Sequence, residues 1–173
     1  MQEFVALHGD RLVRSAYLLC GDRTEAQDLA QETLIQAFKS WSRYRADSAL
    51  YTWVHGILLN LCRRYHRKQK RLIYDDELLR NESMATTAPQ SADLDYCGRT
   101  LAQAIRELSL EHREAIVLRY FDNMKIHEIA HQLGVSEGTI KSRLHYAVRH
   151  LEDLLPRELN QFVSDGTDNN GLP

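Results

Sequence analysis

The chain has 173 residues, of which 43% are hydrophobic, and a formal net charge of -2 at pH 7. This length is sufficient for one medium-sized core or for two small ones. It contains only eight glycines and three prolines, with long runs rich in Leu, Ala, Glu, Arg and Gln. This composition predicts an all-α protein and argues against one built on a sheet.

The cysteines and the apolar segments indicate the compartment. Cys20, Cys62 and Cys97 are odd in number and include no C-x-x-C pair, so a disulfide framework and a thiolate zinc site are both disfavoured. The N-terminus lacks the basic and apolar regions of a signal peptide, and no segment approaches the roughly 20 apolar residues of a bilayer span. We therefore expect a cytoplasmic protein that is not embedded in a membrane.

Two amphipathic helices are expected at the start of the chain. The first covers residues 2–20 and ends at Gly21. Its apolar positions, which recur at roughly helical spacing, are Phe4, Val5, Leu7, Leu12, Ala16, Leu18 and Leu19. Asp22 is a suitable N-cap for a second helix that runs to about Trp41. The opposite face of this helix is polar, and its expected apolar stripe consists of Ala26, Leu29, Ala30, Thr33, Leu34, Ala37 and Phe38.

A third helix is expected from about Leu50 into a basic stretch, because residues 50–71 carry six Lys or Arg residues and no acid. Its inward residues are expected to be Trp53, Val54, Ile57, Leu58, Leu61 and Cys62. Residues 72–97 carry six acidic residues and one basic residue, and they contain Pro89. This segment is interpreted as a flexible acidic linker with a short helical turn near Asp75 to Leu79.

Helical periodicity returns at Gly98. Two helices separated near the sequence LSLEH are expected first, with Ser109 as the N-cap of the second, and two more helices follow between residues 125 and 155. The expected architecture is therefore two small helical domains, at residues 1–71 and 98–155, joined by the linker at 72–97 and followed by a disordered tail at 156–173.

The sequence HEIAHQLGVSE at residues 127–137 has two interpretations. His127, Glu128 and His131 match the H-E-x-x-H pattern of zinc hydrolases, in which both histidines bind the metal. Such a site also needs a third ligand and a sheet beside the cleft, and metzincins need a methionine turn downstream. All three methionines precede the motif, and no strand pattern flanks it. A zinc hydrolase is therefore the less favoured alternative.

A helix-turn-helix accounts for the same residues more completely. Gly134 permits a left-handed turn, and Ser136 is a favoured N-cap for the following helix. The expected buried positions are Ile126, Ile129, Ala130, Leu133, Ile140, Leu144, Ala147, Val148 and Leu151. The outward face of the second helix carries Glu137, Thr139, Lys141, Ser142, Arg143, Tyr146 and Arg149. Short polar side chains backed by cations suit base edges and phosphates, which indicates a DNA-recognition helix. An ordinary helix hairpin with a solvated face is the alternative.

Two blocks of the sequence resemble the extracytoplasmic-function (ECF) group of bacterial RNA polymerase sigma factors. The first block contains EAQDLAQETLIQAF and YTWVHGILLNLCRR, and the second runs from LSLEHREAIVLRYF to KSRLHYAVRHL. The blocks occur in the order and at the separation typical of the family, and the resemblance covers nearly the whole chain. Gln27, where the family usually has an acid, and Cys62 are modest departures that bear on promoter preference.

The resemblance implies binding sites. It implies no catalytic residue, no cofactor and no metal. The surface that docks on core RNA polymerase is expected to contain Asp28, Gln31 and Glu32. The surface that captures the -10 element of the promoter is expected to contain Arg43, Tyr44, Arg45, Asp47, Ser48, Tyr51, Arg63, Arg64, Arg67 and Lys68. The surface that reads the -35 element is expected to contain Ser136, Glu137, Thr139, Lys141, Ser142, Arg143, His145, Tyr146 and Arg149. Trp41 and Trp53 are interpreted as core anchors.

The implied function is that of an alternative sigma factor, which directs promoter-specific transcription initiation and is not an enzyme. Its implied partners are core RNA polymerase, promoter DNA and a membrane-linked anti-sigma factor that wedges between the two domains. One alternative is a helix-turn-helix regulator that acts without polymerase docking, although such a protein requires an α/β domain upstream and the first 97 residues show no strand pattern. A purely structural helical adaptor is a further alternative.

Overall fold

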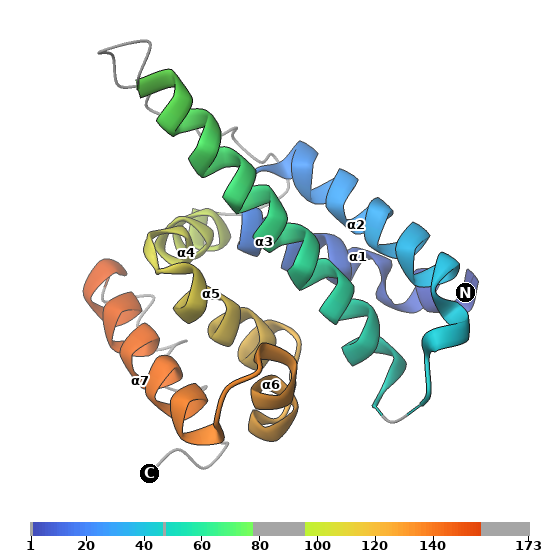
Figure 1. Ribbon diagram of the computed structural model, residues 1–173. Helices are drawn as coiled ribbons and strands as arrows, with labels where there is room; N and C mark the ends of the chain where they lie inside the picture. Colours follow the sequence, from blue (N-terminus) through green and yellow to red (C-terminus); the bar gives the residue numbers. More distant parts are fainter. Residues whose placement is uncertain (1, 47, 78–95, 157–173) are drawn as a thin grey trace. The chain divides into compact units, whose positions relative to one another are not determined.

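The computed structural model describes residues 2–46, 48–77 and 96–156, and every regular element in these ranges is helical. The chain divides into two compact units, Met1–Gln90 and Ser91–Pro173. Figure 1 shows the first unit in blue to green and the second in yellow to red. The prediction of an all-α protein with two helical domains is therefore confirmed.

The first unit is built from three long helices. They are α1 (Gln2–Cys20), α2 (Arg23–Lys39) and α3 (Leu50–Glu77), with the short 3-10 helix η1 (Trp41–Arg43) after α2. Figure 1 shows α1, α2 and α3 packed side by side. Gly21 ends α1 with a positive φ of 83°, and Asp22 begins α2 by accepting the Glu25 backbone N–H at 2.9 Å. Between the helices lie the buried side chains of Phe4, Leu12, Ala16, Leu18, Leu19, Ala26, Ala30, Ala37, Val54, Leu58, Leu59, Leu61 and Cys62.

Three apolar residues predicted for this core lie at its surface instead. Phe38 is 69% exposed, Leu7 is 70% exposed and Val5 is also exposed. At 100° per residue, Phe38 lies about 110° around α2 from the mean direction of the buried Ala26, Ala30, Thr33 and Ala37. In the first turns of α1, the buried residue is Phe4, whose ring contacts that of Tyr51. The predicted stripes were therefore wider than the surface that the neighbouring helices cover.

The end of α2, the first tryptophan and the end of α3 also differ from the predictions. α2 stops at Lys39 and Trp41 lies in η1, where it is 46% exposed, so its interpretation as a core anchor was wrong. α3 continues to Glu77, six residues past the predicted boundary at residue 71, and α4 begins at Tyr96. No proline or glycine lies between the end of the basic stretch at residue 71 and Pro89. A change in the sign of the charge does not by itself end a helix. Leu78 and Leu79, at the end of the predicted helical turn, lie outside the described residues.

The second unit contains α4 (Tyr96–Glu107), α5 (Leu110–Ile116), the π-helical segment η2 (Val117–Phe121), α6 (Ile126–Leu133) and α7 (Glu137–Leu154). Ser109 caps α5, as predicted, by accepting the His112 backbone N–H. The Arg113 guanidinium group donates hydrogen bonds to the carbonyl oxygens of Arg106 and Leu108, which fixes the turn between α4 and α5. The core of this unit includes the fully buried side chains of Ile105, Ala115, Val117, Leu118, Ile129, Ile140, Leu144 and Ala147.

Candidate nucleic-acid interface

The turn between α6 and α7 has the geometry that its sequence predicts. Gly134 adopts the left-handed conformation, with φ 70° and ψ 34°, which residues with a Cβ atom adopt only at a cost. The backbone N–H of Val135 donates to the carbonyl oxygen of Ala130 at 3.1 Å. Ser136 then caps α7 by accepting the Thr139 backbone N–H at 3.1 Å. These contacts set the start of α7 and hence the direction of its side chains.

The two faces of α7 differ sharply. Ile140, Leu144, Ala147, Val148 and Leu151 are all buried, as predicted. On the opposite side, the exposed members of the predicted DNA-reading set are Ser136, Glu137, Lys141, Ser142, His145, Tyr146 and Arg149. Arg143 is half-buried, and so is Thr139, whose hydroxyl group lies 2.9 Å from that of Ser136. Tyr146 is 63% exposed. The helix therefore presents polar, cationic and aromatic groups to solvent.

The H-E-x-x-H letters belong to α6 and to its cap. Glu128 accepts a hydrogen bond from the backbone N–H of Lys125 at 2.8 Å, which satisfies a free donor at the start of α6. His127 and His131 are both exposed, as the helix-turn-helix interpretation predicts. In the part of the chain that the structure describes, no three His, Cys, Asp or Glu side chains are grouped to hold a metal ion. The geometry is that of a capped helix in a helix-turn-helix.

In the first unit, aromatic groups organise the segment that joins α2 to α3. The ring of Tyr44 lies 5.8 Å from that of Trp41 and 5.3 Å from that of Trp53, and its hydroxyl group donates to the Ser48 carbonyl oxygen at 2.8 Å. Arg43, Arg45 and Ser48 are exposed. Ala46 has a positive φ of 58°, and Asp47 lies outside the described residues. This loop thus presents two guanidinium groups beside an aromatic cluster.

Tyr51 belongs to a different set of contacts from the loop residues with which it was grouped. It lies in α3, and its ring is 5.1 Å from that of His8 and 5.6 Å from that of His55. The Arg11 guanidinium carbon lies 4.5 Å from the centre of the Tyr51 ring, within the range of a cation–π interaction. Tyr51 therefore helps to join α1 to α3, and it is only half-buried.

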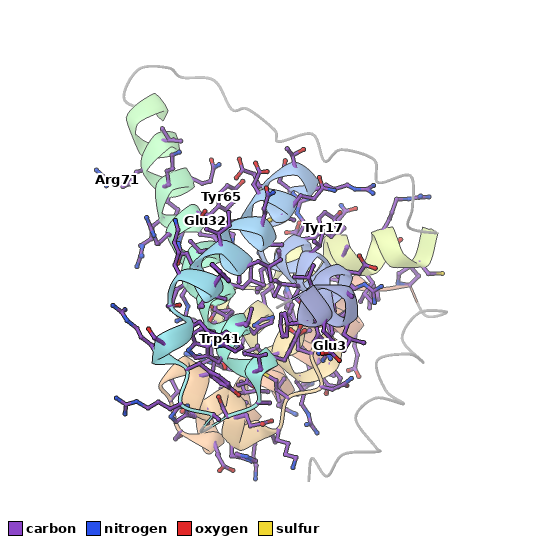
Figure 2. All side chains as sticks on the ribbon, turned by 90° about the vertical axis from the view of Figure 1, so that its right-hand side faces the viewer. Glu3, Tyr17, Glu32, Trp41, Tyr65 and Arg71 are labelled. Carbon is purple, nitrogen blue, oxygen red and sulfur yellow. The ribbon has the colours of Figure 1, made fainter. Side chains whose placement is uncertain are left out.

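The basic run lies in the second half of α3. Arg64, Arg67 and Lys68 are exposed, and Arg63 is half-buried. A groove between α2 and α3 has an apolar floor that includes Leu29 and Leu61, and it is flanked by Arg64, Arg67, Lys68 and Arg71. Figure 2 shows Arg71 toward the end of α3 that lies away from Trp41 in η1. From Leu50 to Arg63 the helix rises by about 20 Å. The structure thus separates the loop and the basic run instead of combining them in one site.

The outward face of α2 contains more than the three predicted polar residues. Asp28, Gln31 and Glu32 are exposed, and Figure 2 labels Glu32 on this helix. Glu32 accepts a hydrogen bond from the Gln36 side chain at 2.9 Å. Ile35 and Phe38, which are exposed by 42% and 69%, lie within the same arc of α2 as these polar residues. From the sequence, Phe38 was placed in the buried stripe and Ile35 was assigned to neither face of the helix.

These features define a protein in which every described regular element is helical and the second unit contains a helix-turn-helix. The sequence matches the Sigma-70 region 2 family over residues 4–72 and the Sigma-70 region 4 family over residues 98–151. None of the described helices is long and apolar enough to cross a membrane.

Comparisons with known proteins give the same family. The chain is 31% identical to the RNA polymerase sigma-E factor of Streptomyces coelicolor over 92% of its own length and 88% of that protein. It is also 33% identical to the ECF RNA polymerase sigma factor SigL of Mycobacterium tuberculosis, over 83% of this chain and 82% of that one. The ECF sigma factor SigE of Mycolicibacterium smegmatis is 31% identical over 92% of this chain, which spans 63% of that relative's length.

Two solved structures are similar to the fold. The sigma factor RpoE from Bartonella quintana, in complex with the anti-sigma factor NepR, aligns with a TM-score of 0.73 and 30% identity over 88% of this chain and 94% of that chain. CnrH, in complex with the cytosolic domain of CnrY, aligns with a TM-score of 0.64 and 26% identity over 88% of this chain and 85% of that chain. The chain therefore belongs to the ECF group of RNA polymerase sigma factors, which is not a family of enzymes.

Proposed function

We propose that this sigma factor acts through three separate surfaces, without catalysis: one for core RNA polymerase and one for each of the two promoter elements. The observation that carries the proposal is the two-faced α7, with a fully apolar buried stripe opposite an exposed set of polar, cationic and aromatic side chains. In helix-turn-helix proteins the second helix enters the major groove, and its N-terminal residues contact the base edges.

The reading of the -35 element is assigned to residues on and just before α7. Ser136, Glu137, Thr139, Lys141 and Ser142 lie at its start, where short side chains can reach base edges. Arg143, His145, Tyr146 and Arg149 follow along the helix and supply phosphate contacts and a larger apolar contact surface. The turn at Gly134 supports this assignment because it fixes where α7 begins.

The capture of the -10 element is divided between two places on the first unit. The loop of Arg43, Tyr44, Arg45 and Ser48 supplies aromatic and cationic groups that suit unstacked bases. Arg63, Arg64, Arg67 and Lys68 supply cations for the phosphate backbone. The rise of about 20 Å along α3 places the basic run several nucleotides away from the bases that the loop captures. Asp47 is part of the proposed loop, and Tyr51 contributes by holding α1 against α3.

Docking on core polymerase is assigned to the outward face of α2. Asp28, Gln31 and Glu32 supply the polar contacts, and we add Ile35 and Phe38 as the apolar ones. Protein interfaces commonly place aromatic anchors at the centre of a polar surround. Because Phe38 is exposed, its replacement should remove binding energy without opening a cavity in the fold.

The domain roles follow from these surfaces. Residues 1–71 bind core polymerase and the -10 element, residues 98–155 read the -35 element, and the acidic residues 72–97 connect them, with 156–173 as a tail. A connection between two weak DNA contacts raises their combined affinity through effective concentration. The site of action is cytoplasmic. An anti-sigma factor, membrane-linked as the resemblance implies, is the proposed inhibitor, and the complexes of RpoE with NepR and of CnrH with CnrY support it.

The direct test is run-off transcription with core RNA polymerase on a genomic promoter library. Wild-type protein is expected to confer initiation at specific sites. Arg143→Ala should reduce initiation by about tenfold or more by weakening -35 binding, which corresponds to about 1.4 kcal/mol or more. Asp28→Ala and Phe38→Ala should affect the step before promoter binding, which is the binding of the sigma factor to core polymerase. Both should lower the affinity for core polymerase, as measured by fluorescence anisotropy.

Arg14→Ala and Asp10→Ala are matched controls, because both residues are exposed on α1 and outside all three surfaces. They are expected to transcribe like wild type. Absence of initiation at every promoter in the library would refute the proposed function. An equal reduction in the controls and in the three test variants would refute the assignment of the surfaces.

A further inference from the structure

Two histidines on the outer face of α6 have no role in the helix-turn-helix or in the proposed promoter contacts. His127 and His131 are four residues apart, and both are exposed. Residues with this spacing project from the same side of a helix, about 6 Å apart along its axis. Neither imidazole ring has a hydrogen-bond or ring-contact partner within the ranges that the structure describes. Both rings are therefore available to a ligand from solvent.

Most of the other histidines are engaged or unsuitably spaced. The Nε2 atom of His66 lies 2.9 Å from the Leu19 carbonyl oxygen, and the Nδ1 atom of His112 lies 3.0 Å from the Ser109 hydroxyl oxygen. His8 and His55 pack against Tyr51. His145 and His150 on α7 are exposed but are five residues apart, which turns them about 140° away from each other. Among the histidines in the described ranges, only His127 and His131 present a pair of rings from one helix face.

The backbone that carries this pair is fixed at both ends. At its start, α6 is held by the hydrogen bond between the Lys125 N–H group and the Glu128 carboxylate. At its end, the backbone N–H groups of Gly134 and Val135 donate to carbonyl oxygens of the last turn. Ile129 and Ala130, between the two histidines in sequence, are buried against the rest of the unit. The two imidazole rings thus extend from a stable helical turn, which lowers the entropic cost of binding one ligand with both.

We propose that His127 and His131 form a bidentate surface site for a divalent transition-metal ion such as Zn²⁺ or Ni²⁺. Imidazole nitrogen is a preferred ligand of these ions, and water molecules complete the coordination when a protein supplies only two groups. Glu128, the base of the zinc-hydrolase pattern, is hydrogen-bonded into the helix cap through one carboxylate oxygen, and it has no role in the proposed site. The ion links the first and last turns of α6, and its binding stabilises the folded helix-turn-helix by mass action.

The site is tested by isothermal titration of the untagged full-length chain with Zn²⁺ and, separately, Ni²⁺ at pH 7.5. The experiment uses a Cys97→Ser background, because the exposed Cys97 thiol is a competing metal ligand. One ion per chain is expected to bind. His127→Gln and His131→Gln should each weaken binding by about tenfold or more, since the second imidazole acts as an intramolecular ligand. His150→Gln, also exposed, is the control and should bind like the parent.

A further readout separates a chelate from nonspecific binding. Saturating metal should raise the melting temperature of the parent by a few degrees, about 2–4 °C, and leave that of the His127→Gln variant unchanged. The proposal is overturned if no binding is detected up to about 1 mM metal, or if the His127 and His131 variants bind as tightly as the His150 variant. All of these variants replace exposed side chains, so loss of folding does not obscure the result.

Discussion

In the first unit, burial changes the pKa of the Cys20 thiol group. Its thiol group donates to the Asp22 carbonyl oxygen at 3.2 Å, where α1 ends. Burial raises the pKa of Cys20 from the ordinary value of 9.0 to about 11, and the nearby carboxylates of Asp22 and Glu25 add to the increase. The folded chain therefore keeps a proton that the unfolded chain loses. For this group, the free energy of unfolding decreases as the pH rises from about 9 to about 11.

This pKa predicts unequal alkylation of the cysteines. At pH 9 half of an ordinary thiol is ionised, whereas about 1% of a thiol with a pKa of about 11 is ionised. Iodoacetamide should therefore modify the exposed Cys97 at least about tenfold faster than Cys20, as followed by mass spectrometry of the peptides. In guanidinium chloride the two rates should become similar. Equal rates in the folded protein would contradict the assigned pKa.

At the scale of the element, the turn between α6 and α7 requires a glycine because of its backbone conformation, and not because a larger side chain would lack space. A Cβ atom added at Gly134 would meet no heavy atom within 4 Å, but φ there is +70°. At Gly138, in the first turn of α7, an added Cβ atom would lie 3.7 Å from the Ser136 hydroxyl oxygen, an ordinary contact, and φ is helical. The two glycines of one motif should therefore respond to alanine in opposite ways.

We predict that alanine changes the free energy of unfolding in opposite directions at these two glycines. Gly134→Ala should lower the free energy of unfolding by about 1–2 kcal/mol, the cost of a left-handed alanine. Gly138→Ala should raise it by about 0.5–1 kcal/mol, because alanine loses less backbone entropy in a helix. Urea unfolding monitored by circular dichroism measures both. A neutral Gly134→Ala would show that the turn does not require its left-handed residue.

At the scale of the whole molecule, a net charge of -2 coexists with a concentrated cationic surface on α3. The six basic residues between 50 and 71 are offset by acidic residues elsewhere in the chain. Because exposed charges more than about 10 Å apart are largely screened at 0.1 M salt, DNA responds to the local charge and not to the sum. An acidic protein can therefore make several phosphate contacts.

Salt dependence tests that conclusion. For the complex with core polymerase bound to promoter DNA, the logarithm of the binding constant falls linearly with the logarithm of the salt concentration. The double substitution Arg67→Ala/Lys68→Ala should make this slope shallower by about 0.7 for each phosphate group of the single strand that is no longer neutralised, or about 1.4 for two. Arg14→Ala, which removes an exposed cation on α1, should leave the slope unchanged. An unaltered slope in the double variant would show that the basic run does not bind DNA.

Much of the second unit could be predicted because its signals are local. Ser109, Gly134 and Ser136 lie at the helix ends that their chemistry favours, and the buried stripe of α7 was predicted residue by residue. Capping and helical periodicity involve only a few neighbouring residues, so they are readable in sequence. In contrast, the loop at 43–48 and the basic run were grouped together by their chemistry alone, although the helix predicted from Leu50 already implied a rise of about 20 Å before the basic run.

The sequence by itself determined the helical class, the positions of the caps, the left-handed turn at Gly134 and the sign of each charged segment. Only the tertiary structure decided that Phe38 and Trp41 are exposed, that Tyr51 joins α1 to α3, and that α3 continues to Glu77. The reason is that periodicity identifies which side of a helix is apolar, whereas burial depends on how far the neighbouring helices extend over that side.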